Sequence, residues 1–365
     1  MMRRLLTLLV AVLVLASAAP AGVAGATAQT QQDDCTFPVT LTDASGTEVT
    51  VEERPDRVTT LNPSAAQTMW EIGGKSQVVG VTDFAGYLDG AEERTSVSKT
   101  DGFGFSVERV VGTEPDLVLA PNTTTTDQVA ALRDAGLTVY LFAAATDTDD
   151  IAQKTTTIGA LTGNCDGAAR TNAWMTANVD AAVSATADRE SPRVLNPLGS
   201  GYVANTNTFI SAMITASGGQ NALADANVTD TPYPQVSDEV ILETNPEVLV
   251  VSSRLDDIQN EEPYQSTIAG QNNATVTVNT SYLNEPAPRS VVYSVRNLTE
   301  AFHPDAEASF VAKSEVTVST ATATPTESTP ADTATTEPST TGEQPGFGVA
   351  ALVLAVGAIV LARRE

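Results

Sequence analysis

The sequence predicts an α/β protein built from two doubly wound lobes that a single long α-helix joins, with a ligand cleft between the lobes. A short unit occurs twice at a constant offset: residues 106–119 read SVERVVGTEPDLVL and residues 237–250 read SDEVILETNPEVLV. Between the copies lies the alanine-rich segment 168–188, which contains no proline or glycine. A unit repeated in this way indicates two similar lobes in one chain. Chance recurrence of a common turn is the alternative interpretation.

Each copy of the repeat reads as a short helix, a tight turn and a buried strand. A serine suited to cap a helix precedes a glutamate in the first turn, where a carboxylate meets the positive end of the helix dipole. A proline then stops the helix, and the β-branched run behind it fits a strand covered on both faces. The serines are Ser106 and Ser237, the glutamates Glu108 and Glu239, and the prolines Pro115 and Pro246.

Strand-like and helix-like segments alternate on both sides of the connector, as in doubly wound sheets. The first half has an opening hairpin over 37–51, expected strands at 57–61, 78–81, 117–120 and 138–142, and expected helices at 63–72, 127–135 and 149–161. The second half has expected strands at 193–196, 248–251 and 275–278, and expected helices at 208–217, 238–243 and 288–302. The connector is predicted as one helix of about 30 Å, at 1.5 Å per residue.

Composition divides the chain further. The expected parts are a signal peptide (1–28), an N-terminal α/β lobe (29–165), the connecting helix (166–190), a C-terminal α/β lobe (191–310), a disordered Thr/Ser/Pro/Glu-rich stalk (311–344) and a sorting or anchor segment (345–365). A basic start, an apolar run and the small residues Ala26-Thr27-Ala28 are typical of a secretory signal peptide. The stalk has no aromatic residue and no hydrophobic periodicity, so it is expected to be disordered.

The last residues, PGFGVAALVLAVGAIVLARRE, resemble the PGF-CTERM sorting signal of archaeal surface proteins. The resemblance implies cleavage by an archaeosortase and replacement of the tail by a lipid, which anchors the exported protein to the outer face of the cell membrane. A tail retained as a membrane anchor would give the same location.

The chain of 365 residues carries a formal net charge of −26, from 45 acidic and 19 basic residues, and is 42% hydrophobic but only 5% aromatic. Such an acidic, lysine-poor surface is typical of a halophile, in which molar salt screens the self-repulsion. The charge therefore reports on the solvent rather than on a ligand. Nucleic acid is excluded as a partner class because the sequence has no basic patch.

Two further features fit an exported protein. Cys35 and Cys165 are expected to form a disulfide, with two free thiols as the alternative. Candidate N-glycosylation sites are Asn122, Asn227, Asn273, Asn279 and Asn297.

The search for catalytic chemistry finds nothing that favours an enzyme. His303 is the single histidine, so a metal cluster of several imidazoles is excluded, and we expect it at the surface or at a helix end. No phosphate-binding or nucleophile motif follows a strand, and no cofactor is expected. Carboxylates are too abundant to identify a paired-acid hydrolase.

With these elements in place, the chain resembles the class III solute-binding proteins of ABC importers, which bind cobalamin or ferric siderophores, here from a halophilic archaeon. The matching stretches are RVTTLNPSAAQTMWEIGGKSQVVGVTDF, SVERVVGTEPDLVLA, YPQVSDEVILETNPEVLVV and EPAPRSVVYSV, in this order between Arg57 and Phe302. The resemblance implies a monomer that delivers a small molecule to a permease dimer with its ATPase subunits. It also implies that Glu108 and Glu239 dock into arginine pockets of the permease; the alternative is that both only favour helix N-termini.

The ligand is expected outside the carboxyl ends of the strands, between the lobes. The candidate contacts, any of which could instead be a packing residue, are Asn62, Ser64, Phe84, Tyr87, Phe103, Tyr202, Tyr233, Tyr282 and Arg289. Aromatic faces with few charges suit a large planar ligand. The VGVTDFAGY loop favours a corrinoid such as cobalamin, whereas Arg289 would suit an anionic ferric chelate. A surface glycoprotein without a transport role is the structural alternative.

Overall fold

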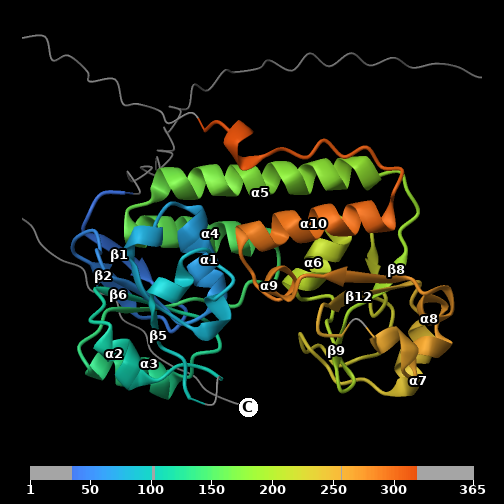
Figure 1. The fold of residues 1–365 in the computed structure, drawn as a ribbon, viewed down its shortest axis with the longest axis horizontal. Coiled ribbons are helices and arrows are strands. Elements are labelled where there is room, and N and C mark those ends of the chain that lie inside the picture. Colours follow the sequence, from blue (N-terminus) through green and yellow to red (C-terminus); the bar gives the residue numbers. More distant parts are fainter. Residues whose placement is uncertain (1–34, 101–102, 256, 319–365) are drawn as a thin grey trace, which may run out of the picture. The chain divides into compact units, whose positions relative to one another are not determined.

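The computed structural model describes residues 35–100, 103–255 and 257–318, which all belong to one compact unit (Figure 1). The signal peptide, the sorting segment and most of the stalk lie outside these residues. Helices in the described ranges are α1 (Pro63–Glu71), α2 (Val107–Gly112), α3 (Thr126–Asp134), α4 (Thr148–Thr162), α5 (Cys165–Thr186), α6 (Phe209–Ala216), α7 (Asp238–Thr244), α8 (Ile268–Asn272), α9 (Thr280–Leu283) and α10 (Pro288–Phe302). None of them is long and apolar enough to cross a membrane.

Each lobe is built on its own parallel sheet, as predicted. The N-terminal sheet has the order β5-β4-β3-β6-β7, with β3 at Val58–Thr60, β4 at Val78–Val81, β5 at Thr95–Ser96, β6 at Leu117–Ala120 and β7 at Val139–Leu141. The C-terminal sheet has the order β11-β8-β12-β13, with β8 at Arg193–Leu195, β11 at Gln220–Asn221, β12 at Val248–Ser252 and β13 at Thr275–Val278. The residues of β6 are fully buried, as expected for a central strand covered on both faces.

Two antiparallel hairpins accompany the sheets. The predicted opening hairpin pairs β1 (Val39–Thr42) with β2 (Glu48–Val51). A second hairpin, which the sequence analysis missed, pairs β9 (Pro197–Gly199) with β10 (Tyr202–Val203) through a turn with left-handed backbone at Gly199, Ser200 and Gly201. The strands β5, β10 and β11 have two residues each, too few to show a periodic pattern.

The two repeat units fold alike. In each, a serine side chain caps the short helix, and a residue with left-handed backbone precedes the proline. The acidic residue after the proline accepts a backbone N–H where the first strand of the lobe's parallel sheet begins, from Arg57 before β3 and from Arg193 of β8. The paired positions are Glu114 (φ 45°) with Asn245 (φ 39°), and Asp116 with Glu247. The repeat therefore reflects one recurring piece of backbone.

The long connector α5 does not cross between the lobes alone. Helix α4 runs beside it: Ile151 of α4 belongs to the hydrophobic core of the C-terminal lobe, whereas Ile158 and Leu161 belong to that of the N-terminal lobe. Helix α10 also packs along α5 (Figure 1). The close packing of α5 requires a glycine, because a β-carbon at Gly167 would overlap the carbonyl oxygen of Ile72. The hinge is thus a layer of three helices, which resists bending more than one helix would.

The prediction of a disordered stalk from residue 311 onward is wrong for the first residues of that segment. Residues 310–316, which we call the strap, leave the C-terminal lobe and run along α5, with a 3-10 turn at Lys313–Glu315. The carbonyl oxygen of Val311 accepts hydrogen bonds from Trp174 and Asn178 of α5, each at 3.2 Å, and Lys313 bonds to Glu71 of α1 at 2.6 Å. Composition did not indicate this order, because a few tertiary contacts hold a segment with no pattern of its own.

Removing the strap should weaken the hinge. A chain that ends at Ser309 is expected to unfold with a free energy about 2 kcal/mol lower than a chain that ends at residue 318, since buried donors on α5 would lose their acceptor, the carbonyl oxygen of Val311. Urea denaturation of the two chains measures the difference. Equal unfolding midpoints would show that the strap adds nothing to stability.

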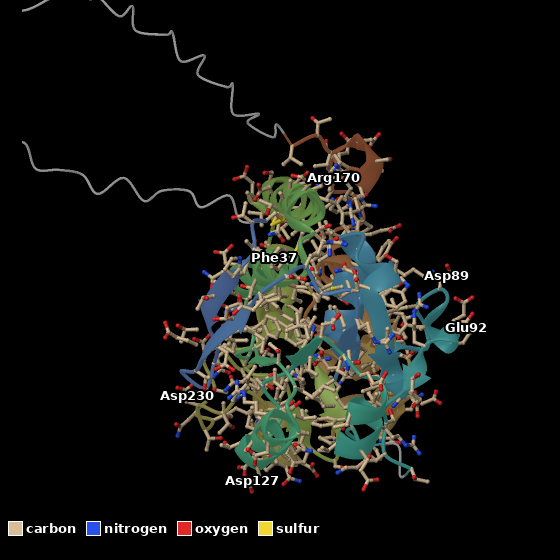
Figure 2. All side chains as sticks on the ribbon, turned by 90° about the vertical axis from the view of Figure 1, so that its left-hand side faces the viewer. Phe37, Asp89, Glu92, Asp127, Arg170 and Asp230 are labelled. Atoms are coloured by element: carbon tan, nitrogen blue, oxygen red, sulfur yellow. A yellow bond between two sulfur atoms is a disulfide. The ribbon has the colours of Figure 1, made fainter. Side chains whose placement is uncertain are left out.

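A disulfide joins Cys35 to Cys165, the first residue of α5, and ties the start of the described chain to the hinge. It lies close to Phe37 in Figure 2. The exposed carboxylates of Asp89, Glu92 and Asp127 point into solvent at other places on the surface in the same view. His303 is the C-cap of α10, which confirms the helix-end alternative of the prediction rather than the surface one. The side chain is 6% exposed, and its Nε2 lies 3.2 Å from the carbonyl oxygen of Gly218.

Candidate ligand-binding site

Asn62 and Ser64 meet where strand β3 ends and helix α1 begins. Asn62 caps the helix, since its Oδ1 accepts the N–H of Ala65 at 3.3 Å, and its Nδ2 donates to Ser64 Oγ at 2.7 Å. Pro63 starts α1 without a backbone donor, which suits the first turn of a helix. These hydrogen bonds fix two polar side chains at the carboxyl end of β3, the middle strand of the N-terminal sheet, as the sequence predicted.

The C-terminal lobe reaches the same place through α9 and α10. Gln67 of α1 donates to the Tyr87 hydroxyl at 2.7 Å and to Ser290 Oγ of α10 at 3.0 Å, and it accepts the N–H of Ser290 at 3.1 Å. The ring of Tyr87 packs edge-on against Tyr282 of α9, with the ring centroids 6.5 Å apart. The predicted residues Asn62, Ser64, Tyr87 and Tyr282 therefore converge on one junction between the lobes.

Lys154 and Glu285, which the sequence analysis missed, bring opposite charges to this junction. The Nζ of Lys154, on α4, donates to Ser64 Oγ at 2.7 Å and to the carbonyl oxygen of Pro286 at 3.2 Å, and so links the two lobes. Burial lowers the pKa of Lys154 to about 8 and raises the pKa of Glu285 to about 8, and the attraction between the two groups only partly offsets each shift. One feature of the sequence could have identified Lys154: it shares a helix face with Ile151 and Ile158, and a lysine on an apolar face indicates a buried polar partner.

These shifts give the junction a defined pH signature. The pKa of Glu285 is higher in the folded protein than its ordinary 4.5, so the folded state holds the extra proton between about pH 4.5 and pH 8. Stability therefore falls as the pH rises through that range. The lowered pKa of Lys154 gives the opposite slope between about pH 8 and its ordinary 10.5. The cost of burying the pair is thus greatest near pH 8.

Replacing both residues should reduce the fall in unfolding free energy between pH 5 and pH 8. With Lys154→Met and Glu285→Gln combined, the fall in unfolding free energy from pH 5 to pH 8 is expected to shrink by on the order of 1 kcal/mol. Urea denaturation at the two pH values measures it. The exposed pair Lys75 and Asp89, 3.0 Å apart, provides the control: Lys75→Met with Asp89→Asn should leave the slope unchanged. An unaltered slope in the Lys154 variant would refute the assignment.

Arg289 lies close to the junction but already has a carboxylate partner. Its guanidinium pairs with Glu71 of α1, and Lys313 binds the second carboxylate oxygen of Glu71 at 2.6 Å. The side chain of Glu71 is only 9% exposed. An anionic ligand at Arg289 would have to compete with this buried carboxylate, so the ion pair argues against the predicted ligand role.

The remaining aromatic candidates are exposed, two on each lobe. Phe84 and Phe103 pack against each other on the N-terminal lobe with ring centroids 6.4 Å apart, and are 45% and 77% exposed. Tyr202 and Tyr233 are 45% and 42% exposed on the C-terminal lobe. Large exposed aromatic side chains suggest a binding surface. The ligand role of these four residues remains a prediction.

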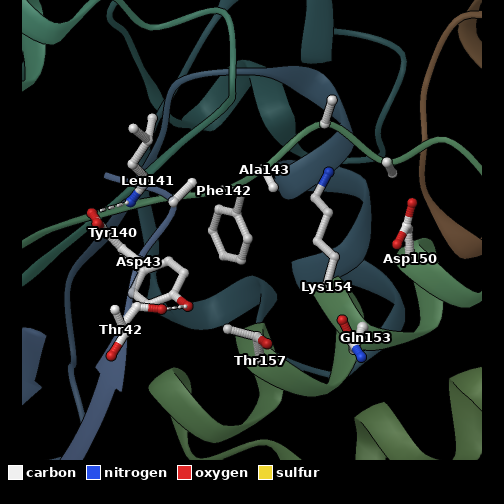
Figure 3. A pocket seen from close by; sticks show the side chains of 13 residues that line it. Thr42, Asp43, Tyr140, Leu141, Phe142, Ala143, Asp150, Gln153, Lys154 and Thr157 are labelled. Atoms are coloured by element: carbon white, nitrogen blue, oxygen red, sulfur yellow. Dashed lines mark hydrogen bonds between the residues drawn. The ribbon is translucent and has the colours of Figure 1, made fainter. Parts of the chain in front are cut away.

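A pocket of about 230 Å³ adjoins the junction, between the hairpin turn, the end of β7 and α4 (Figure 3). The ring of Phe142 lies in the middle of the lining residues, and Lys154 extends from α4 along the wall of the pocket. Asp43 is held by Arg133 at 2.5 Å and by the N–H of Leu141 at 3.1 Å, so this acid is structural. Among the described residues, no group of histidine, cysteine or carboxylate side chains is arranged to hold a metal ion.

Glu108 and Glu239 are both exposed in the first turns of α2 and α7. Figure 1 shows these helices on the side of the two lobes that faces away from α5. The N–H groups of Arg109 and Val240 donate to the capping serines, each at 3.4 Å. The five sequon asparagines are exposed as well.

Comparison with known proteins identifies the family. The model of the periplasmic binding protein family matches residues 58–282. A cobalamin-binding protein of Halobacterium salinarum is 46% identical over 314 residues, which cover 82% of this chain and 85% of that protein. A vitamin B12-binding protein of Yersinia pestis is 25% identical over 64% of this chain and 82% of its own length. The chain therefore belongs to the periplasmic binding protein family.

Solved structures agree on the fold. The heme-binding protein RhuT of Roseiflexus, in its apo form, matches with a TM-score of 0.58 and 23% identity, over 68% of this chain and 99% of that one. The architecture is thus that of a two-lobed, class III binding protein. Membership of the family implies a place outside the cytoplasm, a small-molecule ligand and an ABC permease with its ATPase as partner.

Proposed function

We propose that this protein captures a corrinoid, with cobalamin as the first candidate, and delivers it to an ABC importer. The observation that carries the proposal is the 46% identity to the Halobacterium cobalamin-binding protein over 82% of the chain. Family membership and the two-lobed fold with a polar junction between the lobes support it.

The charges at the junction favour a corrinoid over an anionic ferric chelate, the second candidate. Lys154 faces Glu285, and Arg289 is neutralised by Glu71. Binding an anion there would need a cation without a carboxylate partner, whereas a corrinoid presents mostly uncharged amides that hydrogen-bond to groups such as Asn62 and Ser64. The exposed aromatic residues of both lobes supply flat surfaces for a large planar ring.

A titration with cyanocobalamin tests the proposal. We expect saturable quenching of tryptophan fluorescence by cyanocobalamin and none by a ferric hydroxamate. Tyr87→Ala should weaken binding about tenfold because it removes a ring at the junction, whereas Tyr87→Phe keeps the ring and should stay within about threefold. If folded protein binds the ferric hydroxamate and not cyanocobalamin, the second candidate is correct; if it binds neither, the corrinoid proposal fails.

The proposal extends to the location of the protein. We infer that the residues resembling the PGF-CTERM signal anchor the protein to the outer face of the membrane, with Asn122, Asn227, Asn273, Asn279 and Asn297 as candidate glycan sites. The family resemblance adds that the protein is a monomer. The stalk then holds the binding domain at a distance from the membrane. Mass spectrometry of the native protein would detect an archaeosortase product with a lipid in place of the tail.

A further inference from the structure

A groove beside the hinge gathers an unusual share of the protein's positive charge. It lies between α1, α5, α10 and the strap, with a volume of about 290 Å³. Three of its lining residues are cations, against one carboxylate, in a protein with a net charge of −26. The cations are Arg289, Arg296 and Lys313, and the carboxylate is Glu71. The excess of positive charge is therefore local and built by the fold.

The cations are held in place by other parts of the protein. Arg289 and Lys313 share the carboxylate of Glu71, at opposite oxygens. Arg296 has no acidic partner in the described part of the chain; its guanidinium donates to Asn178 Oδ1 at 2.7 Å and to the carbonyl oxygen of Val311. Neutral acceptors orient this guanidinium without cancelling its charge, as in sites built for anions.

A fourth cation adds to the field. Arg170 of α5 lies close enough to repel Lys313, and Figure 2 shows it on α5 near the strap. Burial, together with the charges of Arg289 and Arg170, lowers the pKa of Lys313, against the attraction of Glu71. An added negative charge would relieve this repulsion.

Aromatic side chains form the other walls of the groove. Tyr282 and Tyr293 have ring centroids 5.0 Å apart, and Trp174 meets Tyr293 edge-on at 6.4 Å. Tyr293 is 44% exposed, so the groove is open to solvent. Because an apolar cavity of about 150 Å³ holds benzene, 290 Å³ has room for one ring and a charged group.

We propose that this hinge groove binds a small aromatic carboxylate, a ligand distinct from the corrinoid, with Tyr282 lying between the two sites. Arg296 would pair with the carboxylate, with Arg289 and Lys313 beside it, and the ring would lie against Tyr293 and Trp174. A carboxylate fits because Arg296 is held by neutral acceptors, whereas Arg289 and Lys313 already share the carboxylate of Glu71.

Calorimetric titration of the full chain with benzoate tests this, with Trp174 fluorescence as a second readout. The titration uses the lowest potassium chloride concentration at which the protein stays folded, because salt screens the attraction. We expect saturable benzoate binding, and at least about tenfold weaker binding of benzamide, which is uncharged, and of inorganic phosphate, which has no ring. Equal affinity for benzoate and benzamide, or no benzoate binding at all, would overturn the proposal. Phosphate binding as tight as benzoate would show a site for small anions in general and refute the aromatic class.

Variants separate recognition from folding. Arg296→Gln should weaken benzoate binding about tenfold, whereas Arg296→Lys keeps the charge and should stay within about threefold. Glu71→Gln should strengthen binding about tenfold, because it removes the carboxylate that lines the groove and competes for its cations, and a gain cannot result from misfolding. Arg254→Gln, at an exposed arginine outside the groove, should have no effect. A loss from Arg254→Gln equal to that from Arg296→Gln, or no gain from Glu71→Gln, would contradict the site.

Discussion

Replacing Glu108 and Glu239 together with alanine is expected to lower cobalamin uptake at least about 100-fold while cyanocobalamin binding stays unchanged. Each glutamate is expected to pair with an arginine pocket of the permease, and losing one partner of a desolvated charge pair costs about 2–5 kcal/mol. Both side chains are exposed in the first turns of α2 and α7, so their loss leaves the cores intact. The measurement is uptake of labelled cobalamin by cells that express each variant, beside a binding titration of the purified protein.

The control removes the same charge elsewhere. Glu92→Ala with Glu300→Ala takes away two exposed carboxylates outside the repeat units and should leave uptake at the level of the unmodified protein. Single variants show whether the lobes contribute equally. They need not, because Glu108 is followed by Arg109, whereas Glu239 follows Asp238. Unchanged uptake in the double variant that still binds ligand would mean that the glutamates serve only the helix N-termini.

Removing the disulfide should have the largest effect on stability. With Cys35→Ser and Cys165→Ser, the unfolding free energy is expected to fall by about 5 kcal/mol, because the bond closes a very long loop and restricts the unfolded chain. The sequence separation of the two cysteines is 130 residues. The folded structure should hardly change, since neither cysteine belongs to the hydrophobic core of either lobe.

Urea denaturation of the oxidised protein, the reduced protein and the serine variant measures this effect. The reduced protein and the variant should agree, since both lack the same bond. Circular dichroism before denaturation checks that all three begin folded. A loss below about 1 kcal/mol in both would show that the unfolded chain stays compact enough for the cross-link to matter little.

The hinge links the ligand site to the rest of the molecule. The junction residues Lys154 and Gln67 each bond across from the N-terminal lobe to the segment 286–290. Glu71, one turn further along α1 than Gln67, binds α10 and the strap. Any change in the angle between the lobes must therefore rearrange polar contacts at the junction and beside α5. The pH dependence predicted for Lys154 and Glu285 is one way to measure that coupling.

The sequence by itself determined the features that depend on local pattern. The two repeat units, the parallel strands with their β-branched runs, the long α5 and the caps at Ser106 and Ser237 all follow from residue type and spacing. The family resemblance followed from the same motifs in their order, and so did the candidate contacts Asn62, Ser64, Tyr87 and Tyr282. Local rules suffice there because a cap or a buried strand needs only its own neighbours.

Only the tertiary structure decided which charges meet. Lys154 and Glu285 are 131 positions apart in a sequence full of acids, and nothing local pairs them. The sequence predicted a ligand role for Arg289, but in the fold Glu71 of α1 pairs with it. The sequence also predicted a disordered strap, but the carbonyl oxygen of Val311 accepts hydrogen bonds from Trp174 and Asn178. The burial of His303 depended on Gly218 in the same way. Such contacts depend on long-range packing and on the exclusion of water, which residue spacing does not encode.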